Sequence, residues 1–260
     1  MTVVNKYLVE DPLNGLVFAP VIEPASTVNP ITITSTYGRL LSGFFNRVPL
    51  LMGFTSFEGI AAESMINMWY LYLLQYQIFP SRLVPDSMNV ARIRKPIAGF
   101  RIKSHYSGDT GSIIFPDENF LHYLSDNEFV RPIEKMARLT CPYTPTYFYI
   151  FSYRHDPTAA GVGHAGELPY IFNSPYDNPN DIITKTRMVR MWTNFAKTAN
   201  PTPSDDPVLD NHVLPTVTPR TFNYIDIDNN LTIGQNPNKA DIDFWSNLFK
   251  EFANPPFMTY

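Results

Sequence analysis

Cysteine, positive charge and long apolar runs are all scarce in this sequence, and each shortage excludes a class of protein or partner. A single cysteine, Cys141, stands among 260 residues, so the chain forms no internal disulfide bond. The formal net charge is −4, which offers no basic face for nucleic acid or anionic lipid. The longest apolar stretch, residues 60–79, is interrupted by Glu63 and by amide side chains, and it is too polar to span a membrane.

The rest of the composition is typical of a globular domain with a sizeable core. Hydrophobic residues make up 44% of the chain and charged residues 17%. The 24 prolines imply many interrupted loops between elements. Residues 1–6 lead into Asp11-Pro12 without a continuous apolar core, so we expect no secretory leader at this end. Asn230-Leu231-Thr232 is a glycosylation sequon, which only a secretory compartment would use.

Runs rich in β-branched and aromatic residues predict four strands. The predicted ranges are Val48–Phe54, Tyr147–Tyr153, Phe222–Ile227 and Leu231–Ile233. The turn-like cluster Asp228-Asn229-Asn230 separates the last two. Because these strands alternate with predicted helices, we expect an α/β sheet.

Apolar residues at three- and four-residue spacing predict three amphipathic helices. The first stripe runs from Met65 to Phe79 and stops at Pro80; its aromatic residues fit either a core or the lining of a binding cavity. The second stripe is Met188, Trp192, Phe195 and Ala199, and the third is Ile242, Trp245, Phe249 and Phe252. Asn238 is the predicted N-cap of the last helix. The proline-rich segment 198–219 predicts a surface loop, not a domain boundary.

Two short segments carry most of the functional information. One reads Gly161-Val162-Gly163-His164-Ala165-Gly166-Glu167-Leu168, and the other reads Gly53-Phe54-Thr55-Ser56-Phe57-Glu58-Gly59. Together they resemble the histidine and acid segments of a serine esterase of the carboxylesterase/cholinesterase type.

Further segments resemble the same family in the same order along the chain. They are Leu16–Glu23, Phe44–Gly53, Ser125–Pro132, Tyr147–Arg154 and Met191–Pro201. In the last of them, Ala199 stands where the family usually has glycine. The resemblance implies the C-terminal half of an α/β-hydrolase fold, with an incomplete, mixed and mostly parallel sheet flanked by helices. Residues 1–260 would then form one partial domain.

The resemblance also implies roles for three residues. Glu58 would be the acid and His164 the general base of a Ser-Glu-His triad; both follow predicted strands, in the order that α/β-hydrolases use. Gly161 and Gly163 predict a mobile backbone that lets the imidazole project. Asp126 resembles a family aspartate that organises hydrogen bonds behind the active site, although a charge at a helix N-terminus explains it equally well.

The sequence contains no Gly-x-Ser-x-Gly for a nucleophile and no His-Gly-Gly-Gly for an oxyanion hole. We therefore expect these 260 residues to be inert alone. The complete protein would hydrolyse a small-molecule carboxylic ester without a cofactor, using an N-terminal half supplied in cis or in trans. The family is mostly secreted or lodged in the secretory pathway, which is the localisation that the resemblance implies.

Other chemistries are less well supported by the residues. His164 and Glu167 could begin a metal site, but nothing clusters with them to complete three or four ligands. Cys141 lies in Thr-Cys-Pro, not in a strained turn into a helix, so a structural thiol is expected. The remaining histidines have no functional context and are expected to be surface or hydrogen-bonded residues: His105, His122, His155 and His212.

Two further hypotheses stay open. One is a non-catalytic binding or interaction module of the same fold, since family members with degenerate triads serve in adhesion. The retention of both Glu58 and His164 argues against it. The other is an incomplete gene model or a splice form without an independent role. The sequence indicates neither the substrate nor the oligomeric state.

Overall fold

The computed structural model describes residues 22–31, 33–63, 73–115, 117–172 and 175–255. The described residues group into two compact units. The second unit holds residues 45–63 and 124–242, and the first holds the described residues before, between and after those ranges. The interpretation of the chain as one partial domain stays a prediction. Most of the segment 16–23 and most of the predicted helix 65–79 lie outside the described residues, although residues 73–78 are helical.

The second unit is built on a four-stranded sheet. Its strands, in spatial order, are β1 (Leu50–Thr55), β2 (Thr146–Phe151), β3 (Asn223–Ile227) and β4 (Leu231–Gln235). The pairs β1–β2 and β2–β3 are parallel, and β3–β4 is an antiparallel hairpin. Leu50 pairs with Thr146 and Thr55 with Phe151, so β1 and β2 end at the same edge. The predicted mixed, mostly parallel sheet is confirmed.

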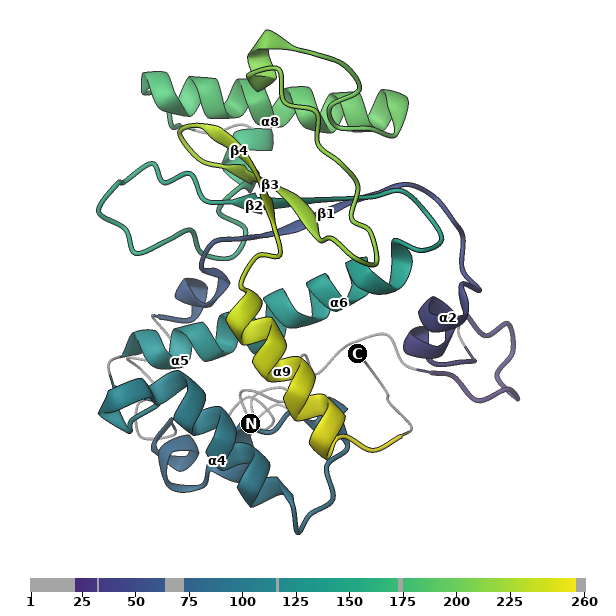
Figure 1. The fold of residues 1–260 in the computed structure, drawn as a ribbon, viewed down its shortest axis with the longest axis vertical. Coiled ribbons are helices and arrows are strands. Elements are labelled where there is room, and N and C mark those ends of the chain that lie inside the picture. The colour runs from purple at the N-terminus through teal and green to yellow at the C-terminus, as the bar shows by residue number, and fades with distance from the viewer. Residues whose placement is uncertain (1–21, 32, 64–72, 116, 173–174, 256–260) are drawn as a thin grey trace. The chain divides into compact units, whose positions relative to one another are not determined.

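Helices cover both faces of this sheet, as Figure 1 shows for α8 and α6. The helical elements of this unit are η1 (Glu58–Ala62), the π-helical segment η5 (Ser125–Val130), α6 (Arg131–Thr140), α7 (Leu168–Ile171), α8 (Pro179–Thr198) and η6 (Pro207–Leu209). Side chains alternate along β2. Tyr147 and Phe151 join an apolar cluster beneath α8, whereas Phe148 and Ile150 join a second cluster with α6. Because β2 is buried on both faces, its sequence is a nearly continuous run of apolar and aromatic residues.

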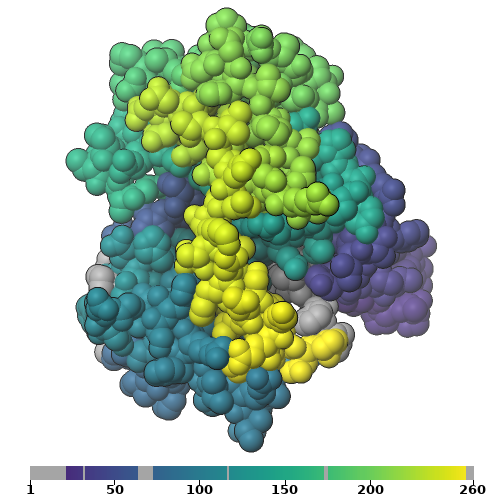
Figure 2. Space-filling model, viewed as in Figure 1, coloured from purple at the N-terminus to yellow at the C-terminus, as the bar shows by residue number. Residues whose placement is uncertain are grey.

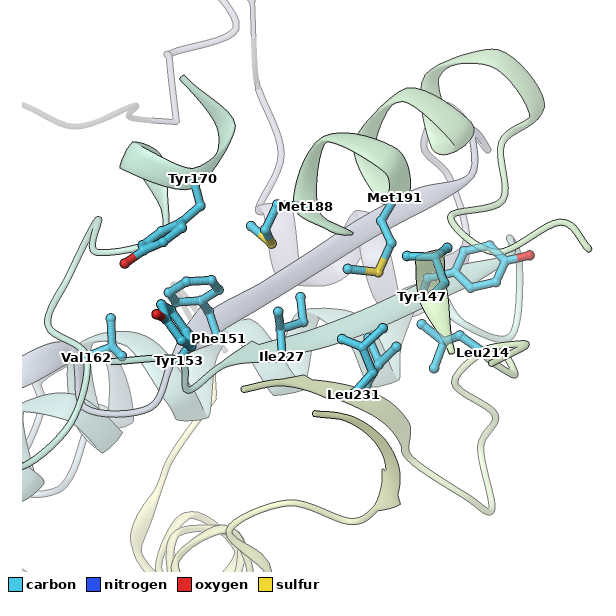
Figure 3. Packing of buried hydrophobic residues seen from close by; sticks show 12 residues of the cluster. Tyr147, Phe151, Tyr153, Val162, Tyr170, Met188, Met191, Leu214, Ile227 and Leu231 are labelled. Atoms are coloured by element: carbon cyan, nitrogen blue, oxygen red, sulfur yellow. The ribbon is translucent and has the colours of Figure 1, made fainter. Parts of the chain in front are cut away.

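The predicted stripe on α8 faces the sheet. Met188 and Met191 are buried and extend from α8 toward the strands (Figure 3), and Trp192 and Phe195 pack against the same cluster. The helix begins with Asn178 as N-cap, in a capping box with Asp181. Its last helical residue is Thr198, and the C-cap Ala199 has the left-handed conformation, with φ 58° and ψ 20°. This conformation explains why the family usually places glycine here.

The regular secondary structure of the first unit, among the residues that the structure describes, is helical. Its elements are α2 (Thr36–Ser42), η2 (Pro80–Leu83), η3 (Asp86–Met88), α4 (Lys95–Ser107), η4 (Gly108–Thr110), nearly all of α5 (Asp117–Leu124) and most of α9 (Lys239–Phe252). The helix α4, together with the residues just before it, lies beside α9; the two are blue and yellow in Figure 2. Trp245 Nε1 donates to the Tyr106 hydroxyl at 2.7 Å, and the Arg94 guanidinium lies 4.5 Å from the Phe252 ring centre.

The third predicted stripe corresponds to α9. Trp245 and Phe252 are buried as expected, together with Leu248. Asn238 precedes the helix at the predicted cap position, but its φ of 46° is left-handed and not the extended conformation of a standard N-cap. No helix among the described residues has both the length and the apolar character needed to cross a bilayer.

The left-handed C-cap at Ala199 yields a stability prediction. Ala199→Gly should raise the free energy of unfolding by about 1 kcal/mol, because glycine adopts a positive φ without the clash that an alanine Cβ makes. Urea unfolding followed by circular dichroism measures it. Ala196→Gly, at an exposed position inside α8, is the matched control and should lower the free energy by about 1 kcal/mol. Destabilisation by both substitutions would show that Ala199 is not strained.

Candidate active site

The candidate acid lies directly after strand β1. Glu58 begins the short helix η1, and only 4% of it is exposed. Its Oε1 accepts a hydrogen bond of 2.7 Å from the backbone N–H of Thr55, the last residue of β1. The carboxylate is therefore fixed relative to the end of the strand.

The candidate histidine lies in the loop between β2 and α7, which we call the His164 loop (residues 152–167). Backbone hydrogen bonds join this loop to the acid loop: Phe57 N donates to Val162 O at 2.9 Å, and His164 N donates to Glu58 O at 3.2 Å. The Val162 N–H also donates to Ser56 Oγ at 3.1 Å. Hydrogen bonds thus join the two loops over several residues.

Gly161 of the His164 loop serves close packing, whereas a Cβ on Gly163 would make only ordinary contacts, the nearest at 3.4 Å. A Cβ on Gly161 would lie 2.6 Å from the Phe57 Cβ, so a side chain there would push the two loops apart. The left-handed residue of the turn is Ala165, with φ 64°. Gly161 is therefore required for close approach, which the prediction of a mobile backbone did not anticipate.

The two candidate side chains meet across these loops. His164 Nδ1 lies 2.7 Å from Glu58 Oε2. The Glu58 side chain is 5% exposed and the His164 side chain 55% exposed, so a buried carboxylate holds a ring that opens to the surface. A neutral imidazole that donates from Nδ1 keeps the lone pair on Nε2, and that nitrogen can then accept a proton.

The π-helical segment η5 contacts both loops of the pair. Ser125 Oγ accepts a hydrogen bond of 2.8 Å from the N–H of Gly59, the residue after the acid. The Phe129 ring lies against the His164 ring, with centres 4.7 Å apart and planes at 37°. Asp126 lies between Ser125 and Phe129 in the sequence, and it is buried. The sequence did not single out Ser125 or Phe129 for a role, although both flank Asp126 in the quoted family segment.

Two ionisable groups beside the pair are strongly influenced by burial. Burial is the main reason why the pKa of Glu167 is raised, and the negative charge of Glu58 raises it further. Burial also raises the pKa of Tyr149, with smaller contributions from Glu167 and Glu58. The Tyr149 ring covers Gly53 of the neighbouring strand, where a Cβ would lie 2.6 Å from the ring. The Glu58 side chain itself is only 5% exposed, and a hydrogen bond from His164 to such a poorly hydrated carboxylate is strengthened.

The remaining candidates from the sequence have ordinary surroundings. In the described part of the chain, no group of three or more His, Cys, Asp or Glu side chains is placed to hold a metal. Burial raises the pKa of the Cys141 thiol, whose Sγ donates to Arg138 O at 3.5 Å. Asn230 is exposed in the turn between β3 and β4. Its glycosylation stays a prediction.

Comparison with known proteins matches this chain to one family model and to several related proteins. The model of the carboxylesterase family matches residues 1–245. Human cocaine esterase (Homo sapiens) is 28% identical over 118 residues, which are 41% of this chain and 21% of that protein. Mouse neuroligin-3 (Mus musculus) is 34% identical over 93 residues, which are 30% of this chain and 11% of that protein.

Solved structures share the fold. Juvenile hormone esterase from Manduca sexta, with OTFP covalently attached, superimposes with a TM-score of 0.74 at 22% identity. The match covers 90% of this chain and 47% of that one. A PNB esterase superimposes with a TM-score of 0.54 at 22% identity, over 80% of this chain and 40% of that one. The chain thus spans less than half the length of these relatives.

The family model extends over most of the sequence, and the sheet with its two helical layers is the one found in esterase structures. This chain belongs to the carboxylesterase family.

Proposed function

We propose that Glu58 and His164 are the acid and the general base of a Ser-Glu-His triad that hydrolyses carboxylic esters. The observation that carries this proposal is the 2.7 Å contact between His164 Nδ1 and Glu58 Oε2. The nucleophilic serine and the oxyanion hole belong to sequence outside these 260 residues, in an N-terminal half that acts in cis or in trans.

Each atom of the pair has a role in such a reaction. Nε2 of His164 takes the proton of the serine hydroxyl as the oxygen attacks the ester carbonyl, and it returns that proton to the leaving alcohol. Glu58 holds the ring in the tautomer with its proton on Nδ1, and it stabilises the imidazolium that forms. The half-exposed position of the His164 side chain supports access of a substrate to Nε2.

The surrounding residues keep this pair aligned. Thr55 and the backbone of the two loops fix Glu58 and His164, and the Phe129 ring supports one face of the imidazole. A general base contributes only when it stays within hydrogen-bonding reach of the proton it takes. For Asp126 we propose the role that its burial beside Ser125 supports, the organisation of hydrogen bonds behind the pair.

The partner of this site would be a small-molecule carboxylic ester, and no cofactor is needed. The secretory pathway is the compartment that we propose from the family resemblance. The exposed position of Asn230 supports it, because a sequon can be glycosylated only where an enzyme reaches it.

A non-catalytic binding module is the second candidate function. The observation in its favour is that the chain also matches a relative whose name does not denote an esterase, neuroligin-3, at 34% identity over 93 residues. The match to cocaine esterase is longer, at 28% identity over 118 residues. The hydrogen-bonded Glu58–His164 pair favours the triad, because binding alone does not require an imidazole aligned on a buried carboxylate.

The first functional prediction concerns the chain alone. Purified residues 1–260 should hydrolyse a chromogenic ester no faster than the His164→Ala variant, because an imidazole without a positioned hydroxyl lacks the proximity that makes triad attack effectively intramolecular. Initial rates at several enzyme concentrations measure this. Turnover that disappears when one of the chain's own serines is replaced would show that the nucleophile is present here after all.

The second prediction concerns the assembled protein. When a carboxylesterase-family N-terminal half bearing Gly-x-Ser-x-Gly is joined to this chain, ester turnover should appear. His164→Ala should then remove nearly all of it, and Glu58→Gln should lower kcat by about four orders of magnitude, because the amide favours the wrong imidazole tautomer. Steady-state kinetics with the same chromogenic ester measure both effects.

Two matched variants serve as controls for that experiment. Glu63→Gln and His122→Ala make the same chemical changes at exposed positions and should leave kcat within about twofold of the unmodified protein. Turnover that is indifferent to His164 would overturn the triad, and so would an equal loss in the control variants.

A further inference from the structure

We propose that Asp181 is the positioning residue of the His164 loop: its single buried carboxylate holds both ends of the loop that presents the imidazole. The inference rests on the proposed role of His164 as general base, and it extends that role to a residue on a different helix. Asp181 lies in the first turn of α8, and the residue is 0% exposed.

One oxygen of Asp181 receives two tyrosine hydroxyls. The Tyr153 hydroxyl donates to Oδ1 at 3.0 Å, and the Tyr170 hydroxyl donates to the same atom at 3.3 Å. Tyr153 lies just after β2, where the His164 loop begins, and Tyr170 lies in α7, just after the loop ends. Both tyrosines are buried, at 3% and 2% exposure. Hydrogen bonds of this kind, from a hydroxyl to a buried ionised acceptor, are among the stronger ones in proteins.

The other oxygen is also occupied. Oδ2 accepts from the Asn178 backbone N–H at 3.1 Å, and His155 Nδ1 lies 2.9 Å from it. The His155 ring stacks on Tyr176, with centres 4.2 Å apart and planes at 18°. The contact with Asn178 is the ordinary capping-box bond of α8. The two tyrosine contacts and the His155 contact go beyond what a helix cap needs, and all three residues belong to the His164 loop or its flanks.

The Asp181 carboxylate stays ionised and can therefore accept these hydrogen bonds at all working pH values. Burial alone would raise the pKa of Asp181, but hydrogen bonds from Tyr153, His155 and Asn178 outweigh it and hold the pKa below its usual value. An aspartate normally ionises near pH 4, so Asp181 stays charged throughout the range in which an esterase works. Burial, followed by the hydrogen bond to Asp181 and the charge of Asp181, raises the pKa of Tyr153 to about 12, so that hydroxyl stays a donor over the same range.

The loop is thus held in two independent ways. Backbone hydrogen bonds of Val162 and His164 join its middle to the acid loop. Its two ends are joined to each other through Asp181. Figure 3 shows Tyr153 and Tyr170 together at one end of the apolar cluster, with Tyr147 at the other end. If the ends separate, the middle must either shift or break its bonds to the acid loop, and the imidazole then moves relative to Glu58.

Hydrogen exchange followed by mass spectrometry tests this inference on the 260-residue chain at low micromolar concentration. The variant Tyr153→Phe/Tyr170→Phe removes both hydroxyls and keeps both rings. Peptides from residues 154–167 should exchange at least about tenfold faster than in the unmodified chain, because two charge-assisted hydrogen bonds are lost. Peptides from β2 and β3 should change by less than about twofold.

The control is Tyr147→Phe, which removes a hydroxyl from the same cluster at the start of β2 and should leave exchange in the loop unchanged. Asp181→Asn is the second variant, and it should accelerate exchange in the same peptides. In the assembled esterase, the double variant should lower kcat and leave KM within about twofold, because it misplaces the base and does not touch the substrate.

Exchange in the loop that stays unchanged in the double variant would overturn the inference. So would an equal acceleration in the loop and in the strands, because Asp181 would then support the fold in general. Failure of the proposed function looks different: the assembled protein with the unmodified chain would show no turnover, whatever the exchange rates of the loop are.

Discussion

The parallel pairing of β1 with β2 is the constraint on which the candidate site depends. Because Thr55 and Phe151 are paired at the last position of the two strands, the loops that follow them leave the sheet at the same edge. Glu58 lies three residues beyond β1 and His164 lies farther along the loop after β2, yet their side chains are 2.7 Å apart. An antiparallel pairing would send one of these loops to the opposite edge. Burial of β2 on both faces, under α8 and α6, keeps the register of this strand pair fixed.

The candidate site combines a rigid carboxylate with a supported but accessible imidazole. Glu58 is buried and bound to the Thr55 backbone, whereas more than half of the His164 side chain is exposed. Exposure leaves a ring free to change rotamer, so the alignment of His164 has to come from its neighbours. The Phe129 ring, the backbone bonds to the acid loop and, in our proposal, the connection of the loop ends through Asp181 supply it.

Much of the fold was predictable from local sequence. The strands and the helix of Met188 and Trp192 have strong patterns, because each presents apolar residues at the period of its own backbone. Glu58 and His164 were predictable as a pair because their motifs follow two predicted strands in the order of the family. The same pattern could not reveal Ser125, Phe129 or Asp181. Their contacts join residues far apart in the chain, and neither a serine nor an aspartate at the start of a helix differs in sequence from an ordinary cap. Nor could it show that Gly161 serves the approach to Phe57, since a glycine that is mobile and one that is closely packed look alike in sequence.

The central claim is that Glu58 orients His164 as a base, and the tautomer of the imidazole tests it most directly. Nuclear magnetic resonance of the chain labelled with ¹⁵N at histidine, with His164 assigned by its loss in a His164→Gln variant, reports which ring nitrogen carries the proton at neutral pH. Our account predicts that the neutral form of the ring carries its proton on Nδ1, bound to Glu58, and leaves Nε2 unprotonated. A ring protonated on Nε2 alone, or one whose signals do not respond to Glu58→Gln, would contradict it.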